Sequence, residues 1–440
     1  MKKSEAIQEK LQGIASKVQE NKYISAITNG LIAALPVSIV GAIGGILNAL
    51  PIQGYQDFLV ATRLKEVTPI LTMVTTNLLA LYVVFLIAMK FAEAHKTDGV
   101  PAGLLALMSF LIITPLGNVA ESISAFISSN NITLAEGVVP TGSDFLPLEW
   151  LGAAGLFSAF IVALSTAKIY VTFKQKGWTI KMPDGVPPTV SKSFSSLVPG
   201  IVIGFCALAL RFVMLLTPFG SIHAAIFKII AAPLANLGGS IVAMFIAILV
   251  AHILWICGVH GTMVIYSVFA GIWYPLQMAN LAAFNANEPI PNLVSMSLFA
   301  MVLFMGAGGT VGLVVLMIRG KADQHRVLGK LAIIPNLFGI NEPVLFGLPI
   351  IMNFTLAIPF IIMPLLTLLI AYIGLVTGIL PYLTGVSTPL GTPIIISGLL
   401  GGGWKWAVFQ LLMMILSYFV YLLFFKIADK MAYEKELSAK

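Results

Sequence analysis

The sequence predicts an all-α polytopic membrane protein. Of its 440 residues, 58% are hydrophobic and only 10% are charged, and its mean hydropathy is +0.98. Uninterrupted apolar runs of about 20 residues recur along the chain, which is the length that an α-helix needs to cross a bilayer. Because backbone polar groups find no water in the bilayer core, these runs are expected to be helical.

The apolar runs predicted to span the membrane follow one another along the whole chain. In chain order they are Ile24–Leu50, Val67–Phe91, Val100–Leu116, Leu151–Phe173, Leu197–Thr217, Ser240–Cys257, Leu293–Ile318, Phe354–Leu380 and Trp404–Phe425. Shorter broken segments between the later runs are expected to re-enter the membrane as hairpins. The whole pattern predicts about ten transmembrane helices plus re-entrant hairpins.

The positions of Lys and Arg predict which loops face the cytoplasm, because basic residues favour that side. They are concentrated in residues 1–22, 168–192, 319–330 and 426–435, whereas residues 117–150 contain none. We therefore expect a multi-pass protein of the cell membrane with both termini in the cytoplasm. This asymmetry also accounts for the net charge of +7, so we expect the lipid bilayer, and no nucleic acid, as a partner.

Composition divides the chain into modules. Residues 1–22 are polar and mixed in charge, unlike a signal peptide, and are expected to form a cytoplasmic amphipathic helix. A tract near residue 221 has apolar residues at helical spacing with His223 and Lys228 among them, which favours an interfacial connector. We predict an N-terminal helical module (residues 1–220), an amphipathic connector (221–237) and a C-terminal module (238–440).

Three segments of the C-terminal module are too short or too broken to be simple spans. They are Gly258–Phe284, Pro335–Pro349 and Thr384–Gly403. Short apolar segments interrupted by Gly and Pro are the sequence feature that most often indicates the substrate site of a transporter. The alternative is that these segments are ordinary loops between helices.

Glu342 is the strongest candidate for a functional residue. It lies in Gly-Ile-Asn-Glu-Pro, flanked by long apolar runs, and a carboxylate at membrane depth is costly unless it is paired or faces a wet cavity. Asn341 adds an amide beside the carboxylate, a combination that suits sugar hydroxyls, and Glu342 has the chemistry of a general base. The alternative is a helix-end carboxylate paired with a basic residue such as Lys330.

His260 is the second candidate. It lies in Gly-Val-His-Gly at the end of a predicted span, and neighbouring glycines let a ligand approach the backbone closely. A neutral imidazole both donates and accepts a hydrogen bond, which suits a sugar hydroxyl; the alternative is a structural helix cap. Trp255, just over one turn earlier, either stacks on a sugar ring or packs in the core. We expect His252 to be structural. We expect Arg211 to extend to the membrane interface; the alternative is that it contacts the substrate.

Motifs of soluble enzymes and of metal sites are missing from the sequence. There is no phosphate-binding glycine loop and no His/Cys cluster with metal-ligand spacing, and the two cysteines, Cys206 and Cys257, lie in apolar runs. We therefore expect no cofactor, no metal and no ATP-driven pumping by this chain alone.

Three motifs together resemble one protein family. Gly-Val-His-Gly, Pro-Asp-Gly-Val-Pro-Pro-x-Val-x-x-Ser-Phe and Gly-Ile-Asn-Glu-Pro-Val-Leu-Phe-Gly are similar to motifs of the enzyme IIC membrane component of phosphoenolpyruvate-dependent sugar phosphotransferase systems. The branch they resemble is that of lactose, cellobiose and diacetylchitobiose, and the resemblance covers essentially the whole chain.

The resemblance implies a homodimer whose N-terminal helices make the subunit contact and whose C-terminal module holds the sugar. It implies that sugar enters from outside and is phosphorylated inside by the phosphocysteine of a separate enzyme IIB. His260 and Glu342 match the family's sugar-binding His and Glu and are therefore the expected catalytic pair. Asn341 matches the neighbouring Asn, and Trp255 and Thr392 complete the expected substrate-binding set.

One stretch departs from the family. Relatives often carry a Trp in a Pro-Trp-Thr-x-Pro stretch, whereas this chain has Pro-Leu-Gly-Thr-Pro at 389–393, with Leu390 in the Trp position. With this alignment a stacking platform is absent, and the sugar need not be cellobiose or diacetylchitobiose. No IIA-like or IIB-like domain is fused to the chain, so the phosphoryl donor is expected in trans.

Three functions were compatible with the residues alone. A phosphotransferase-coupled permease yields sugar phosphate and needs enzyme IIB, with a β-linked di- or oligosaccharide as the expected substrate. A proton-coupled secondary transporter using Glu342 accumulates unmodified sugar, and a membrane receptor binds sugar without uptake. Broken helices favour transport, and only the family resemblance favours phosphorylation over proton coupling.

Overall fold

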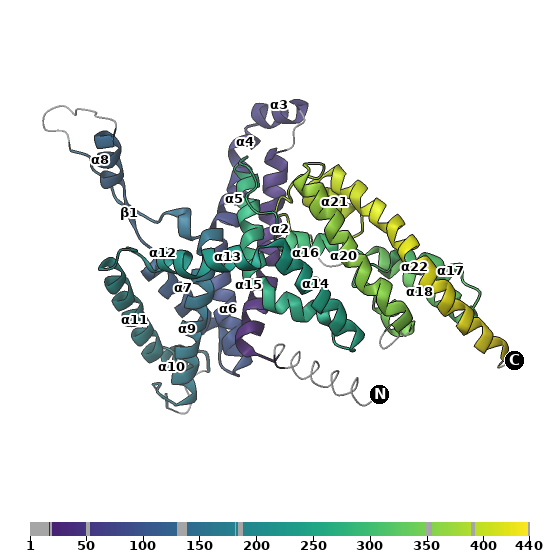
Figure 1. Cartoon of the computed structure of the whole chain (residues 1–440). Helices are drawn as coiled ribbons and strands as arrows, with labels where there is room; N and C mark the ends of the chain where they lie inside the picture. Colours follow the sequence, from purple (N-terminus) through teal and green to yellow (C-terminus); the bar gives the residue numbers. More distant parts are fainter. Residues whose placement is uncertain are drawn as a thin grey trace. The chain divides into compact units, whose positions relative to one another are not determined.

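The fold is helical (Figure 1), and the chain divides into two compact units. The computed structural model describes residue 17 and residues 20–49, 53–129, 139–180, 182–183, 188–348, 350, 354–388 and 392–438. The scaffold unit, as we call it here, contains Asn29–Val37 and Ile70–Pro233. The site unit contains Met1–Thr28, Ser38–Pro69 and Leu234–Lys440.

In its described residues, the scaffold unit consists of helices and one pair of short antiparallel strands. Its α-helices are α6 (Leu79–Ala94), α7 (Gly99–Ile113), α8 (Val119–Ser129), α9 (Leu156–Gln175), α10 (Pro188–Ser195), α11 (Leu197–Leu215) and α12 (Ile222–Ile226). Shorter turns are η1 (Thr76–Leu78), η2 (Leu148–Trp150), η3 (Ala153–Gly155) and the π-helical η4 (Phe227–Ala231). Strands β1 (Gly117–Asn118) and β2 (Asp144–Phe145) pair antiparallel, with Gly117 opposite Phe145.

The core of the scaffold unit lies where α6 packs against α7 and α9. Large side chains such as Phe91, Phe110 and Tyr170 are fully buried there. The close approach of α6 and α7 depends on glycine, because a Cβ at Gly103 would lie 2.7 Å from the ring of Phe85. Small residues at such crossings are the usual means by which membrane helices pack closely.

The site unit carries most of the C-terminal half. Its helices are α3 (Gln53–Ala61), α4 (Leu64–Val67), α14 (Ile241–Ile256), α15 (Gly261–Asn285), α16 (Met296–Val302), α17 (Val311–Ile318), α18 (Asp323–Leu337), α19 (Glu342–Gly347), α20 (Phe354–Val376), α21 (Ile396–Gly402) and α22 (Trp404–Ser438). Three helices have residues in both units: α2 (Lys22–Ala49), α5 (Pro69–Val74) and α13 (Ala232–Gly238).

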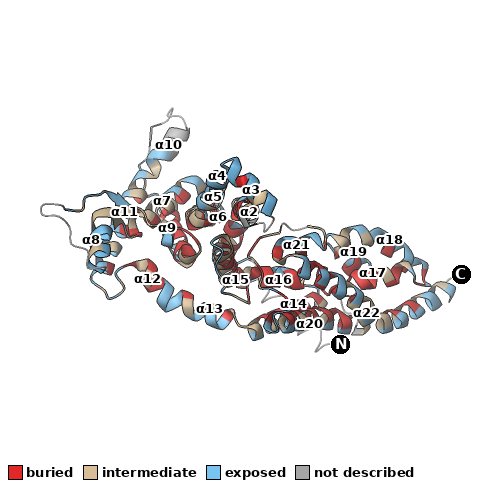
Figure 2. Ribbon diagram, turned by 90° about the horizontal axis from the view of Figure 1, so that it is seen from above, coloured by how far each residue is buried: buried red, intermediate tan, exposed pale blue. Residues whose placement is uncertain are grey.

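Within the site unit, α17 packs against both α18 and α22, and α20 packs against α14 and α22. Figure 2 shows α16 and α17 largely buried. The contact between α17 and α22 is made backbone to backbone, because a Cβ at Gly312 would lie 2.0 Å from the amide nitrogen of Tyr418. Only glycine permits this packing at that position.

Several helices are long and apolar enough to cross a membrane. Among the described residues they are Lys22–Gly41, Leu64–Ala94, Ala153–Gln175, Ser193–Leu215, Thr355–Val376 and Trp404–Ser438. A seventh candidate is the bent pair Ile222–Gly238 and Ile241–Ile256, and α7 is apolar but shorter. The structure thus confirms a helical protein with several membrane-spanning segments.

One predicted span is wrong. Leu293–Ile318 was expected to be a simple span, but the structure breaks it into α16 and α17 with irregular backbone between residues 303 and 310. The break occurs at Gly306, Gly308 and Gly309, which have φ of 74°, 78° and 63°. That region of φ is left-handed and is readily adopted by glycine.

Candidate functional site

Glu342 is positioned by a turn between α18 and α19. Pro335 lies in the last turn of α18, and its carbonyl accepts hydrogen bonds from the amides of Phe338 and Ile340. Gly339 follows with φ of 75°, and a Cβ there would approach the carbonyl oxygen of Phe304 to 3.0 Å. The turn therefore ends α18 and starts α19 at Glu342.

His260 is positioned by the short connection between α14 and α15. It is the N-cap of α15, and its Nδ1 accepts a hydrogen bond of 3.3 Å from the amide of Met263. This bond fixes the ring and leaves Nε2 directed away from the helix end. His260 therefore does cap the helix, as the structural alternative proposed, but capping uses only one of its two ring nitrogens.

The two candidates meet in the structure. Nε2 of His260 lies 3.9 Å from Oε1 of Glu342, and their side chains are 38% and 45% exposed. A separation of 3.9 Å is too long for a hydrogen bond, and a hydroxyl beside the line that joins the two atoms is within hydrogen-bond distance of both. An ion pair between Glu342 and Lys330, the alternative considered above, is not seen among the described residues.

The second carboxylate oxygen of Glu342 is inaccessible to solvent. Within the described part of the chain, Oε2 has no hydrogen-bond partner. An unpaired buried acceptor of this kind is costly and rare, and because it has no accessible surface a ligand reaches this carboxylate through Oε1.

Trp255 packs against the ring of His260. Its ring centroid lies 4.2 Å from that of His260, its Nε1 donates to the Thr262 hydroxyl at 2.9 Å, and the residue is only 4% exposed. The structure thus places Trp255 in contact with His260, in the packed position that was the alternative to stacking on a sugar.

Asn341 lies beside Glu342 but is buried. It is 3% exposed, and its side-chain amide donates to the carbonyl of Ala307 and to the hydroxyl of Thr310. Its backbone carbonyl accepts the amides of Val344 and Leu345 and so begins α19.

The last broken segment is joined to the site through α18. The amide of Ile394 donates to the carbonyl of Leu337 at the end of α18, and Thr392 is partly buried nearby in the chain. Leu390, with its neighbours at 389 and 391, lies outside the described residues, so the proposed loss of a stacking Trp stays a prediction.

Sequence reasoning missed the buried amides that hold this segment. Gln410 of α22 accepts the amides of Ile395 and Gly398, and Gln277 of α15 donates to the carbonyl of Gly385 and to Ser387. Both glutamines are buried in apolar helices. A glutamine within an apolar run is the signal that would have identified them, since buried polar groups are almost always hydrogen-bonded.

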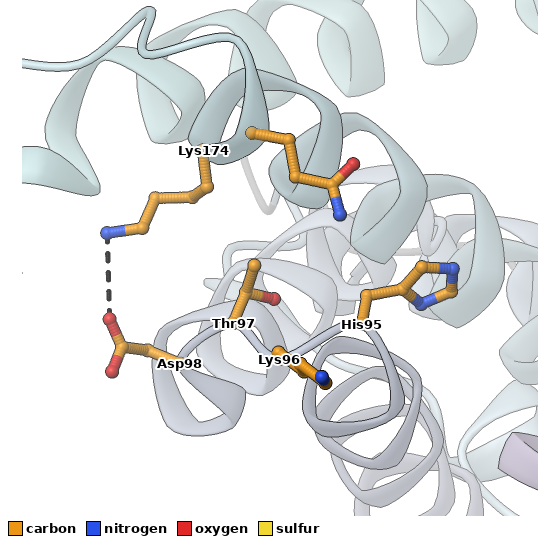
Figure 3. A pocket seen from close by; sticks show the side chains of 6 residues that line it. His95, Lys96, Thr97, Asp98 and Lys174 are labelled. Carbon is orange, nitrogen blue, oxygen red and sulfur yellow. Dashed lines mark ion pairs between the residues drawn. The ribbon is translucent and has the colours of Figure 1, made fainter.

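A polar pocket of about 520 Å³ lies in the scaffold unit, apart from these candidates (Figure 3). It is lined by His95, Lys96, Thr97, Asp98, Lys174 and Gln175. Lys174 lies 3.6 Å from Asp98 and also donates to Ser195. No residue predicted to bind substrate lines this pocket, and its paired charges tie α9 to the loop after α6.

Arg211 has a structural role. Its guanidinium donates to the carbonyls of Ile112 and Thr114, and its place at the membrane interface stays a prediction. These carbonyls lie at the C-terminal end of α7, where helix carbonyls lack partners within the helix. A positive charge there also interacts favourably with the helix dipole.

We expect Gly261→Ala to destabilise the protein, because a Cβ at this position would lie 1.8 Å from the carbonyl oxygen of Ala251. Overpacking of this kind costs about 1–3 kcal/mol or more and would shift His260 at the start of α15. Thermal unfolding in detergent should show a lower melting temperature. Gly54→Ala is the control, because nothing lies within 4 Å of a Cβ there; equal melting of both variants would contradict the packing.

The chain is similar to one family over most of its length. A family model described as "Phosphotransferase system, EIIC" matches residues 28–364. A putative permease IIC component of Bacillus subtilis, YwbA, is 37% identical over 98% of this chain and 96% of its own. The lichenan permease IIC component of Bacillus subtilis is 36% identical, over 99% of this chain and 95% of its own.

A cellobiose-specific EIIC component of Geobacillus stearothermophilus is 34% identical, over 96% of this chain and 94% of its own. Among solved structures, the transporter ChbC is similar. It is the IIC component of an N,N′-diacetylchitobiose-specific phosphotransferase system, with a TM-score of 0.86, 34% identity and coverage of 97% of this chain and 98% of that chain.

Proposed function

Because the chain belongs to the EIIC family of phosphotransferase-system membrane components, we propose that it carries a β-linked di- or oligosaccharide inward for phosphorylation. It is a sugar permease of this system. Relatives named for lichenan and cellobiose, together with the diacetylchitobiose transporter, support the choice of substrate class, since all three carbohydrates are β-linked.

One observation carries the site assignment. Nε2 of His260 and Oε1 of Glu342 lie 3.9 Å apart, and their side chains are 38% and 45% exposed, so that a ligand can reach both. A sugar hydroxyl between them donates to the carboxylate and accepts from Nε2 of a neutral-tautomer imidazole that carries its proton there. Trp255 holds the His260 ring, and Thr392 belongs to the same proposed set.

The chemical step uses Glu342 as a general base. The hydroxyl oxygen of the sugar attacks the phosphorus of the phosphocysteine on enzyme IIB, forming an O–P bond while the S–P bond breaks. The hydroxyl proton passes to the Glu342 carboxylate, and the cysteine thiolate leaves. A positioned carboxylate suits this role, because phosphoryl transfer depends mainly on orientation and electrostatics.

The family resemblance supports an arrangement around this site. We infer about ten transmembrane helices with re-entrant hairpins, of which residues 1–220 form the scaffold and subunit contact of a homodimer. Residues 221–237 connect it to the transport module at 238–440, which moves as a body. Both termini face the cytoplasm, where phosphorylated enzyme IIB docks in trans.

Vesicle uptake tests this function against proton coupling. Vesicles that contain the protein and enclose phosphorylated enzyme IIB should accumulate sugar phosphate from external radiolabelled cellobiose. Vesicles without enzyme IIB should accumulate no sugar phosphate. A protonophore should leave uptake unchanged, because phosphorylation of the sugar, and not a proton gradient, drives its accumulation. Free sugar accumulated without enzyme IIB, and abolished by the protonophore, would contradict the proposal.

A further inference from the structure

The break between α16 and α17 is built so that only glycine fits it. A Cβ on Gly308 would lie 2.1 Å from the ring of Phe360. A Cβ on Gly306 would lie 2.5 Å from Cγ of Asn341. The backbone between α16 and α17 therefore lies directly against the side chain of Asn341, the residue before Glu342.

Side chains from three elements satisfy the backbone of this break. The carbonyl of Gly308 accepts from the Tyr421 hydroxyl at 2.7 Å, and that of Gly309 accepts from Ser417 at 2.5 Å. The amide of Gly308 donates to Nε2 of His252 at 3.0 Å, and the carbonyl of Ala307 accepts from Asn341. Irregular backbone at membrane depth requires such partners, and these carbonyls are already engaged by the protein.

Thr310, at the end of the break, joins it to both sides of the turn that presents Glu342. Its hydroxyl is fully buried and accepts from the amide of Asn336 at 2.9 Å and from that of Asn341 at 3.2 Å. Asn336 lies in the last turn of α18, and Asn341 is the residue before α19. One hydroxyl therefore ties the end of α18 and the start of α19 to the break.

We propose that Asn341 is a positioning residue that fixes Glu342 through Ala307 and Thr310, and that its side chain does not bind the sugar. Its amide nitrogen has two hydrogens, and both are used, one by the Ala307 carbonyl and one by Thr310. At 3% exposure its side chain faces the break and not the space beside Glu342. This inference rests on the proposed function of Glu342 and changes the role of its neighbour.

Binding of cellobiose and its monodeoxy derivatives to the purified protein tests the inference. Thr310→Val and Asn341→Ala should each weaken binding of every sugar by the same factor, about two- to thirty-fold, as expected for coupling through a packed contact. The double variant should be no weaker than the weaker single variant. Thr310→Ser keeps the hydroxyl and should bind as the wild type does, and melting temperatures show that each variant is folded.

A different pattern would overturn the inference. If Asn341 binds a hydroxyl, Asn341→Ala alone will stop discriminating against one monodeoxy sugar, while Thr310→Val binds as the wild type does. Wild-type affinity in both variants also overturns it. Failure of the proposed function is separate, because it shows as wild-type affinity in Glu342→Ala or as no cellobiose binding by the wild type, and either result removes the basis of the inference.

Discussion

Replacing Glu342 with glutamine should reduce phosphorylation of the sugar by about 10²- to 10⁴-fold, the range lost with a general base, while sugar binding weakens much less. The glutamine side chain keeps an oxygen that accepts from a sugar hydroxyl, but it does not take up the hydroxyl proton. Single-turnover transfer from phosphorylated enzyme IIB to radiolabelled cellobiose measures this loss. An equilibrium binding assay on the same preparation gives the affinity.

The chain supplies a matched control for this variant. Glu288 lies in a second Asn-Glu-Pro tripeptide at 287–289 and is exposed. Glu288→Gln removes the same charge from the same local sequence and should phosphorylate at the wild-type rate. Equal rates for the wild type and Glu342→Gln would show that Glu342 is not the base, and equal losses in both variants would show an effect of net charge.

Replacing His260 should weaken sugar binding by about 2- to 12-fold, because a hydrogen bond between two neutral groups contributes about 0.5–1.5 kcal/mol. His260 also caps α15 through Nδ1, so alanine removes both functions. Asparagine is a good N-cap but is too short to reach the group that Nε2 serves. Titration calorimetry with cellobiose and thermal unfolding together separate the two effects.

His260→Asn should lose affinity while it melts near the wild-type temperature. His260→Ala should lose affinity to a similar extent and in addition melt lower, since loss of a cap costs about 0.5–2 kcal/mol. If His260→Asn binds as tightly as the wild type, the imidazole serves only as a cap, which was the structural alternative for this residue.

The membrane class and the family followed from the sequence alone. Apolar runs and low charge are properties of composition, so they predict a helical membrane protein without any tertiary information. The resemblance carried by the motifs around His260 and Glu342 is confirmed by the family match over residues 28–364. The count of about ten transmembrane helices, the homodimer, the orientation and the roles of the site residues stay predictions.

The break at residues 303–310 was not predicted, although its glycines are visible in the sequence. Hydropathy averages over a window, and a run such as Met305-Gly-Ala-Gly-Gly-Thr310 remains apolar on average. Glycine is also common inside membrane helices, so it does not by itself indicate a break. The positive φ of Gly306 depends on contacts with distant helices, which no local pattern contains.

The neighbours Asn341 and Glu342 show that a motif predicts which residues matter but not what each of them contacts. The sequence placed both near the substrate, because an amide beside a carboxylate suits hydroxyl groups. In the structure the carboxylate faces His260, whereas the amide faces Ala307 and Thr310. Adjacent residues at the start of a helix point in different directions, and the partner of each is set by tertiary packing.

The central claim is that His260 and Glu342 bind one sugar together, and a double-mutant cycle tests it most directly. Radiolabelled cellobiose binding would be measured for the wild type, His260→Asn, Glu342→Ala and the double variant. If both side chains hold the same hydroxyl, each single variant loses most of the affinity and the double variant loses little more, because the two contacts depend on each other. Losses that add in full would contradict a hydroxyl held by both side chains, and wild-type affinity in either single variant would contradict a shared sugar site.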